Sequence, residues 1–390
     1  MDYLDYGKKY LMNTYNHLPV VFTHGEGCKL FDTDNKEYLD FTSGIGVMAL
    51  GYGNKNWIKA VEAQLERVVH TSNIFLNIPV LELAKKFTET SDMSKVFFCN
   101  SGAEANEGAI KLARKYSFDK HGKARNTILT LKKSFHGRTI TTLKAGGQEK
   151  LHKYFYPFTE GFKYAEANVK ELEKSIDSSI CAIMIEPIQG EGGINPLSEE
   201  FVHKVFEIAK KDDILVICDE IQCGIGRTGK LYGFNNYGVC PDIMSTAKGL
   251  GGGLPIGAVL CNEKLNNTFQ YGDHGSTFGG NPVCAAGALE VLNVISEDSF
   301  LKEVREKGNF VRKYFKNKNK KNILEVRGMG LMIGIEIEGE ASKIQKEALK
   351  KGLLVLTAGP NVVRLLPPLV ISKEDLEEGL NILYKIIEED

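Results

Sequence analysis

Residues 245–257 read STAKGLGGGLPIG and place one lysine, Lys248, among small and apolar neighbours. Glycines let the backbone approach a planar ligand closely. A lysine amine attacks carbonyls only when it is unprotonated, and desolvation lowers its pKa because burial disfavours the charged form. Lys248 is therefore a candidate nucleophile for Schiff-base chemistry. Taken alone, the stretch is more typical of a surface lysine before a flexible loop, since glycine clusters usually mark loops.

An apolar run upstream favours the chemical interpretation. Residues 214–218, ILVIC, are typical of a buried strand, and Asp219 and Glu220 follow them directly. An acid at the carboxyl end of a core strand lies where open α/β sheets bind their ligands. The sequence therefore predicts that Asp219 and Lys248 belong to one ligand site.

Strand-like runs alternate with helical patterns through the middle of the chain. The runs are 95–99, 127–131, 181–185, 214–218, 242–245 and 257–261, and helical patterns begin at Ala103 and after Ser198. This alternation predicts an α/β fold with a parallel sheet that helices cover on both sides. Helical patterns over 56–70 and after Pro79 are expected to face the core.

Both ends of the chain differ from this pattern. Residues 20–41 predict a small antiparallel cap, and the chain beyond Pro282 predicts two helices, strands within 323–338, a helix over 342–351, strands 353–356 and 362–365, and a closing helix after Ser372. The expected division is an amino-terminal arm and cap (1–55), a large α/β domain (56–281) and a small α+β domain (282–390).

Composition limits the class of protein. A chain of 390 residues with a formal net charge of −1 gives no electrostatic reason to bind nucleic acid or membrane surfaces, so small-molecule chemistry is expected. The first twenty residues resemble neither a signal peptide nor a membrane span, which predicts a cytoplasmic protein. The eight cysteines form no CxxC pair and are expected to be reduced. The sequence contains no HExxH motif or similar cluster, so no metal site is expected.

Two polar motifs follow predicted strands. Residues 100–104, NSGAE, open a helix, and the backbone amides of Gly102 and Ala103 could meet a phosphate there, although a plain helix cap is as good an explanation. Residues 134–139, SFHGRT, offer Phe135 to stack on a planar ring and Arg138 to hold a carboxylate; taken alone, a packed Phe and a solvated Arg are the simpler interpretation.

A third motif is misleading. Residues 224–230, GIGRTGK, match GxGxxG and most of a Walker phosphate loop. Leu231 stands where Ser or Thr should bind magnesium, and no strand-turn-helix context surrounds the motif, so nucleotide binding is not expected.

Together these motifs resemble those of the class III, fold type I, pyridoxal-phosphate aminotransferases, most closely the N-acetylornithine aminotransferases of arginine biosynthesis. The resemblance runs from about Leu18 to the carboxyl end. It implies a large domain with a mostly parallel sheet covered by helices, and a smaller α+β domain formed by the amino-terminal segment and the carboxyl-terminal part. It rests on FFCNSGAEANE (97–107), FHGRT (135–139), EPIQGEGG (186–193), DEIQCGIGRTG (219–229), the lysine stretch, HGSTFGGNP (274–282), EVRGMGLMIG (325–334) and NVVRLLPP (361–368).

The resemblance implies roles for the residues that hold pyridoxal 5'-phosphate. Lys248 would bond to the cofactor, and Asp219 would pair with its ring nitrogen. The remaining implied contacts are Gln222 near the phenolic oxygen, Phe135 and Ile221 on the two ring faces, and Gly102 and Ala103 at the phosphate. Thr277 would join the phosphate site from the neighbouring subunit, which implies a homodimer.

The resemblance also implies two carboxylate sites. Arg138, with Ser276 near it, would hold the distant carboxylate of N-acetylornithine, and Arg364 would hold the carboxylate of glutamate. Glu191 would cover Arg364 while the amine donor is bound.

Two departures concern the substrate and the packing. Ile45 stands where ornithine aminotransferases carry a tyrosine that recognises a free α-amino group, which favours an acylated donor but leaves succinylornithine and 4-aminobutyrate open. Residues 51–54, GYGN, replace a commoner Gly-His pattern and are expected to alter only packing. A non-catalytic pyridoxal-phosphate-binding regulator is the alternative from another class, disfavoured because no additional module precedes Leu18.

Overall fold

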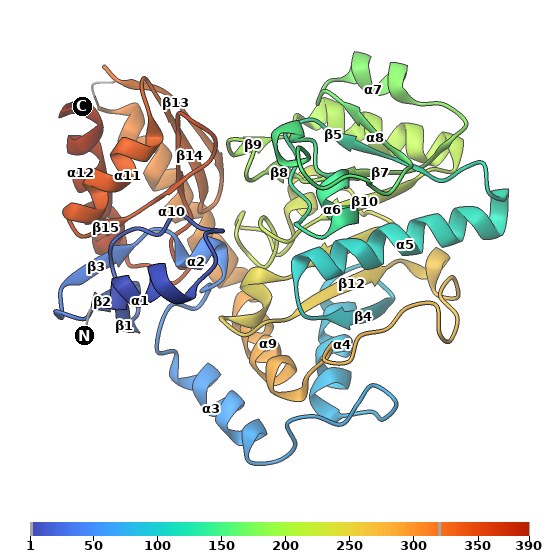
Figure 1. The fold of residues 1–390 in the computed structure, drawn as a ribbon, viewed down its shortest axis with the longest axis horizontal. Helices are drawn as coiled ribbons and strands as arrows, with labels where there is room; N and C mark the ends of the chain where they lie inside the picture. The colour runs from blue at the N-terminus through green and yellow to red at the C-terminus, as the bar shows by residue number, and fades with distance from the viewer. Residues whose placement is uncertain (1–2, 319–320, 390) are drawn as a thin grey trace.

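A seven-stranded sheet forms the centre of the larger part of this computed structural model, which describes residues 3–318 and 321–389 (Figure 1). In spatial order the strands are β4 (Lys95–Cys99), β12 (Gly257–Cys261), β11 (Ile243–Thr246), β10 (Leu215–Asp219), β7 (Ile180–Ile185), β5 (Thr127–Leu131) and β6 (Phe162–Ala165). Residues 1–2, 319–320 and 390, which the predicted terminal parts include, lie outside the described residues. The short edge strand β6 was not predicted, because its four residues show too little alternation to distinguish them from a loop.

The sheet is mostly parallel, as expected, and one strand runs against the others. β12 pairs antiparallel with both β11 and β4. Only residues 247–256 separate β11 from β12, and parallel neighbours need a crossover of a dozen residues or more. The short lysine stretch therefore reverses the chain within the sheet.

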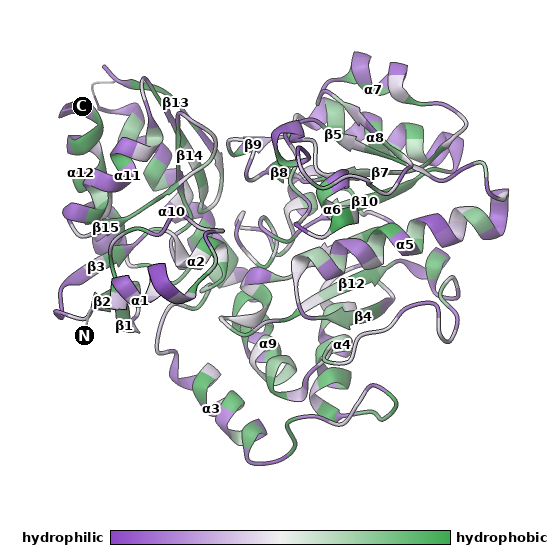
Figure 2. Ribbon diagram, in the orientation of Figure 1, coloured by the Kyte–Doolittle hydropathy of each residue, from purple (hydrophilic) through white to green (hydrophobic). Residues whose placement is uncertain are grey.

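Helices cover both faces of this sheet, as predicted. Ile217 of β10 belongs to a core cluster with side chains of α5 (Gly102–His121). Its neighbour Val216 points the other way and joins the main cluster, which includes α4 (Ile78–Thr90), α8 (Glu199–Asp212) and α9 (Pro282–Ile295). Two-sided burial explains why these strands are continuously apolar, as the green colour of β7 and β10 in Figure 2 shows.

The two ends of the chain together form the smaller α+β part, in blue and red in Figure 1. One sheet has the order β1 (Phe22–Glu26), β2 (Lys29–Asp32), β3 (Glu37–Asp40) and β15 (Leu353–Leu354), and the other has β13 (Ile323–Met329), β14 (Met332–Ile337), β17 (Val362–Leu365) and β16 (Leu356–Thr357). β15 pairs parallel with β3 and so joins the two ends. The division at residues 55 and 281 stays a prediction.

The other elements connect these layers. The helices are α1 (Tyr3–Tyr10), α2 (Ser43–Gly46), α3 (Lys55–Leu65), α6 (Ile140–Ala145), α7 (Val169–Ser175), α10 (Asp298–Lys316), α11 (Ala341–Lys350) and α12 (Lys373–Glu389). The short elements are β8 (Ile188–Gln189), β9 (Asn195–Pro196) and the 3-10 turns η1 (Glu149–Leu151), η2 (Gly233–Tyr237), η3 (Lys248–Gly251) and η4 (Glu263–Leu265). Within the described residues, no helix is long and apolar enough to cross a membrane.

The expectation that α3 and α4 face the core is only partly correct. Leu83 and Phe87 of α4 are fully buried, but Leu65 at the end of α3 is 51% exposed and Leu81 of α4 is 46% exposed. Exposed apolar residues continue between the two helices, at Ile74, Phe75 and Leu76, and at Ile78, the first residue of α4. Helical spacing shows that one face is apolar, but it does not show what covers that face.

Candidate active site

One cavity of about 430 Å³ lies at the carboxyl ends of the central strands. Loops that follow β4, β5, β7, β10 and β11 supply its lining. The predicted residues that it brings together are Gly102, Ala103, Phe135, Arg138, Glu191, Asp219, Ile221, Gln222 and Lys248. Residues distant in sequence therefore meet where parallel sheets bind their ligands.

Asp219 ends β10 and is held on both carboxylate oxygens. Asn106 Nδ2 donates to Oδ2 over 2.8 Å, His136 Nδ1 lies 2.8 Å from the same oxygen, and the Ile221 amide donates to Oδ1 over 3.0 Å. Ser245 Oγ in turn donates to Asn106 Oδ1 over 2.6 Å. These partners fix the direction in which the carboxylate faces the cavity.

Sequence reasoning gave no role to Asn106 or His136. His136 stands inside the SFHGRT motif between two residues that were assigned, and Asn106 lies on α5 one turn after the predicted phosphate site. The sequence offered one signal for such residues. A polar residue that is expected to be buried one turn or one strand away from an assigned residue needs a hydrogen-bond partner, and the assigned residue can supply it.

Lys248 begins η3 and is the lysine of this cavity. Burial lowers its pKa, while the negative charges of Asp219 and Glu191 act in the opposite direction. Its backbone has a φ of 43°, in the left-handed region that residues other than glycine rarely adopt. The amine is buried and its pKa is lowered, as Schiff-base chemistry requires, although charged groups lie near it.

The amino end of α5 faces the cavity with Gly102 and Ala103. Ser101 caps the helix by accepting from the Glu104 amide over 3.2 Å, and Glu104 Oε2 accepts from the Asn100 amide over 2.6 Å. The amides of Gly102 and Ala103 are among the first four of the helix, which have no intrahelical partner. A side chain at Gly102 would put its Cβ 2.8 Å from Ile221 Cδ1, so a larger residue there would displace the Ile221 side chain.

Glu186 braces two loops of the site and was also missed from the sequence. Its carboxylate accepts from the Phe135 amide over 2.9 Å and from the Gly190 amide over 3.0 Å. Burial raises the pKa of Glu186 to about 7. The guanidinium of Arg138 lies above the ring of Phe135, with its carbon 5.5 Å from the ring centre. Arg138 is exposed, as a residue that receives a ligand from solvent should be.

Arg364 reaches the cavity region from β17 of the smaller part. Its side chain forms an ion pair with Glu191, and Arg364 Nη1 donates to Gln222 Oε1 over 3.2 Å. Burial would raise the pKa of Glu191, but the charge of Arg364 outweighs it and the pKa is lowered. Among the described residues, Arg364 Nε is a buried donor without a partner. The structure thus brings together the two residues that were expected to pair.

Ser276 and Thr277 lie elsewhere. They line a second cavity of about 370 Å³, where Asn100 Nδ2 donates to Ser276 Oγ over 3.2 Å. Neither is among the residues lining the first cavity of the same chain, so this chain alone does not place Ser276 beside Arg138. Ile45 does not line the first cavity either, whereas Val47, two residues later, does.

The donors in this cavity fit a planar cofactor with an aldehyde, a ring nitrogen and a phosphate. Lys248 offers an amine of lowered pKa, Asp219 offers a fixed carboxylate, and the amino end of α5 offers free amides to an anion. The class of protein that this fold and site define is the pyridoxal-phosphate aminotransferase. The profile of the Aminotransferase class-III family matches residues 10–387, and the chain belongs to that family.

Named relatives cover the whole chain. It is 48% identical to an acetylornithine aminotransferase of Caldanaerobacter subterraneus subsp. tengcongensis, with 99% of each chain covered. It is 45% identical to that of Methanocaldococcus jannaschii, over 100% of this chain and 98% of the relative.

Solved structures agree on the fold. The N-acetylornithine aminotransferase of Stenotrophomonas maltophilia K279a has a TM-score of 0.86 at 34% identity, covering 99% of this chain and 98% of the other. The ornithine aminotransferase of Toxoplasma gondii ME49 has a TM-score of 0.95 at 30% identity, covering 99% and 94%.

Proposed function

We propose that this protein is an N-acetylornithine:2-oxoglutarate aminotransferase of arginine biosynthesis, with pyridoxal 5'-phosphate as its cofactor. The donor gives its δ-amino group and becomes N-acetylglutamate 5-semialdehyde, and 2-oxoglutarate collects the amino group as glutamate. The observation that carries the proposal is the pair of arginines around Lys248: Arg138 is open to ligand, whereas Arg364 is covered by Glu191. The relatives that share 44–48% of the sequence support the choice of donor.

When bound, pyridoxal phosphate supplies an aldehyde that accepts the amino group and a ring that withdraws electrons from the substrate carbon. Lys248 would hold the cofactor, and its amine would move the proton at the substrate carbon as base and acid. Asp219 would keep the ring nitrogen protonated. Phe135 and Ile221 would cover the ring, Gln222 would meet its phenolic oxygen, and Gly102 and Ala103 would bind the phosphate.

Two substrates of different shape require two carboxylate sites. The reacting amine of N-acetylornithine is far from its carboxylate, so Arg138 holds that carboxylate at a distance, with Ser276 assisting from the partner subunit. Glutamate reacts beside its own carboxylate, which Arg364 binds after Glu191 moves away. The cover is reasonable because an unpaired buried arginine is costly.

The enzyme works as a homodimer in the cytoplasm, with Thr277 completing the phosphate site of the partner. Exposed apolar residues support the dimer: Phe75 is 66% exposed and Leu76 is 79% exposed. Asn73, next to them, donates to the Ser276 carbonyl over 2.7 Å, so a subunit that covers this surface also meets the loop of Thr277. The three parts 1–55, 56–281 and 282–390 pack as one unit.

The test is a comparison of amine donors. Cofactor-loaded enzyme is mixed with acetylornithine, succinylornithine, ornithine, 4-aminobutyrate or glutamate, and the absorbance of the cofactor reports its conversion to the amine form. We expect acetylornithine to react fastest among the ω-amines. Faster conversion by ornithine or 4-aminobutyrate would make the donor assignment wrong, and no conversion by any amine would favour a cofactor-binding regulator.

A further inference from the structure

A left-handed turn lies beside the lysine stretch. Ser43, Gly44, Ile45 and Gly46 have φ values of 42°, 62°, 67° and 79°. Such a φ is easy for glycine, but it is a rare conformation for a β-branched residue such as Ile45, because Cβ approaches the following carbonyl oxygen. The turn that leads to Val47 in the cavity lining is therefore strained.

Two more residues with this conformation meet the turn. Ile225 has a φ of 50° and Lys248 has a φ of 43°. A Cβ built on Gly249 would lie at ordinary contact distances, 3.4 Å from the Gly46 carbonyl oxygen and 3.5 Å from Ile225 Cβ, so both strained segments pack beside the residue after Lys248. Strained backbone persists only where surrounding contacts determine it strongly.

Arg227 supplies such contacts. It is 2% exposed, and its Nη1 donates to the carbonyl oxygens of Pro367 and Leu331 over 2.5 and 3.3 Å. Its Nη2 donates to Ser43 Oγ over 3.4 Å, and Ser43 Oγ donates to the Leu366 carbonyl over 2.6 Å. One buried guanidinium therefore links the loop after β10, the left-handed turn and the loop after β17.

Asp40 holds the start of the same turn. Its Oδ1 accepts from the amides of Thr42 and Ser43 over 2.7 and 3.1 Å, and its Oδ2 accepts from Tyr52 Oη over 2.8 Å. Tyr52 belongs to the GYGN stretch, so this stretch contacts the turn through Asp40. Asp40 is also the charge that opposes the effect of burial on Arg227.

We propose that Arg227 is a positioning residue for Lys248: it holds the turn 43–46 and Ile225 against Gly249 and so fixes where the lysine presents its amine. The proposal rests on the proposed function in one respect, the role of Lys248 as the reacting lysine. It also gives the GIGRTGK motif a purpose other than nucleotide binding. The glycines of that motif admit the close packing, and its arginine joins the two parts of the molecule at the active site.

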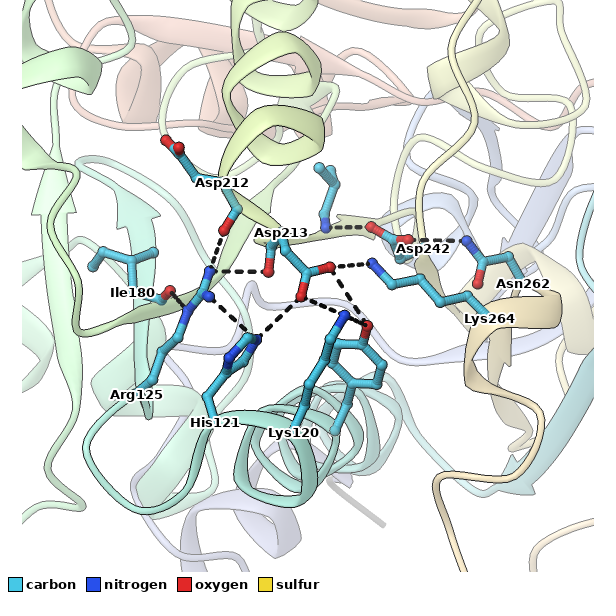
Figure 3. A network of polar contacts seen from close by, with 11 residues as sticks. Lys120, His121, Arg125, Ile180, Asp212, Asp213, Asp242, Asn262 and Lys264 are labelled. Atoms are coloured by element: carbon cyan, nitrogen blue, oxygen red, sulfur yellow. Dashed lines mark hydrogen bonds and ion pairs between the residues drawn. The ribbon is translucent and has the colours of Figure 1, made fainter.

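The test compares Arg227→Met with a matched control, Arg125→Met. Arg125 also bonds carbonyl oxygens, those of Ile180 and Asp212 over 2.7 Å and Asp213 over 2.9 Å (Figure 3). Ile180 begins β7, so this cluster lies at the opposite edge of the sheet from the cavity. Both variants should have a lower Tm.

Only Arg227→Met should change the chemistry. We expect its kcat to fall roughly 10- to 100-fold, while the KM of the amine donor stays within about threefold, because a misplaced amine slows reaction more than binding. The pH at which the absorbance of the Lys248-bound cofactor changes should also shift. An unchanged kcat and spectrum, or equal losses in Arg125→Met, would overturn the proposal.

Milder variants keep the test decisive if Arg227→Met does not fold. Ser43→Ala removes one link of the cluster and should lower kcat in the same direction. Glycine adopts the left-handed conformation without cost, so Ile45→Gly should relieve the strain of the turn. We therefore expect Ser43→Ala to lower kcat less when it is added to Ile45→Gly than when it is added to the wild type. Absence of any loss in Ser43→Ala, or an equal loss in both backgrounds, contradicts the proposal. Each kcat is measured with the donor that reacts fastest with the wild type, and the spectrum of the bound cofactor is measured without any donor. The test therefore remains valid if the substrate assignment is wrong.

Discussion

At the residue scale, the charge of Asp219 is the feature to test, because its hydrogen-bond partners hold the carboxylate toward the cavity. Asp219→Asn keeps the shape of the side chain but cannot hold a proton on a cofactor nitrogen. We expect the protein to fold and bind cofactor, and the single-turnover rate with acetylornithine to fall by about 100-fold or more, in line with loss of one strong electrostatic contact at a reacting group. Asp212→Asn, at an exposed position, is the control. A single-turnover rate near that of wild type would exclude this role of Asp219.

The two arginines should separate the half-reactions. Arg138→Ala should chiefly slow the acetylornithine step, and Arg364→Ala the glutamate step. Each loss should cost about 2–4 kcal/mol, or roughly 30- to 1,000-fold in kcat/KM, because a charge-assisted contact disappears. Separation will be incomplete, since the second carboxylate of 2-oxoglutarate can reach Arg138. Arg312→Ala, whose arginine bonds Gly328 and Asn309 outside the cavity, should leave both steps unchanged. Equal damage to both steps in both variants contradicts the two-site assignment.

At the scale of elements, α5 joins the cavity to a polar network at its far end. Asp213 follows α8 with a φ of 50°, and its carboxylate lies 2.8 Å from Lys120 Nζ, 3.1 Å from His121 Nε2 and 3.0 Å from Lys264 Nζ (Figure 3). Burial would raise the pKa of Asp213, but the hydrogen bonds from Lys120, Lys264 and His121 outweigh it and hold the pKa well below its usual range. The network therefore anchors the carboxyl end of α5, opposite the end that carries Gly102.

Asp213→Asn should weaken this anchor. Asparagine tolerates the left-handed conformation, so the variant removes charge rather than introducing strain. Because the folded-state pKa is depressed, the carboxylate stabilises the fold above its unfolded value of 3.8, and this contribution is lost as the pH falls further. We expect a Tm about 2 °C or less below wild type at pH 7, consistent with a partly exposed network worth about 1 kcal/mol, and a gap that narrows below pH 4 and in high salt. A gap independent of both pH and salt would show that the charge is not responsible.

At the scale of the whole molecule, the position of Thr277 outside its own cavity predicts shared sites. If the proposed homodimer forms, co-expression of Lys248→Ala and Thr277→Ala subunits gives a hybrid dimer. If Thr277 serves the partner, one of the two hybrid sites contains both native residues, and the hybrid should recover about half of the wild-type activity at limiting cofactor. Each variant alone should be impaired. If Thr277 instead serves its own chain, mixing restores nothing.

Much of the fold follows from local patterns in the sequence. Strands such as 214–218 are apolar throughout because both faces of the sheet are buried. In helices such as α8, apolar residues recur at helical spacing because one face of the helix packs against the core. Lys248, Asp219, Gly102 and Phe135 could be proposed as site residues because each lies within four residues after a predicted strand. The direction of β12 is not contained in its own apolar pattern; the short connection over residues 247–256 is what indicates it.

The sequence by itself determined the order of the elements, the α/β class and the motifs that carry the chemistry, because periodicity and turn residues act over a few neighbouring positions. Only the tertiary structure decided which other distant polar groups meet: Asn106 and His136 with Asp219, and Arg227 with Ser43. Each of these contacts joins segments that lie far apart in the chain, and each side chain is held in place because a buried polar group without a partner is costly. Local sequence patterns do not specify such pairs, so the side chains that support the site can be identified only in the folded chain.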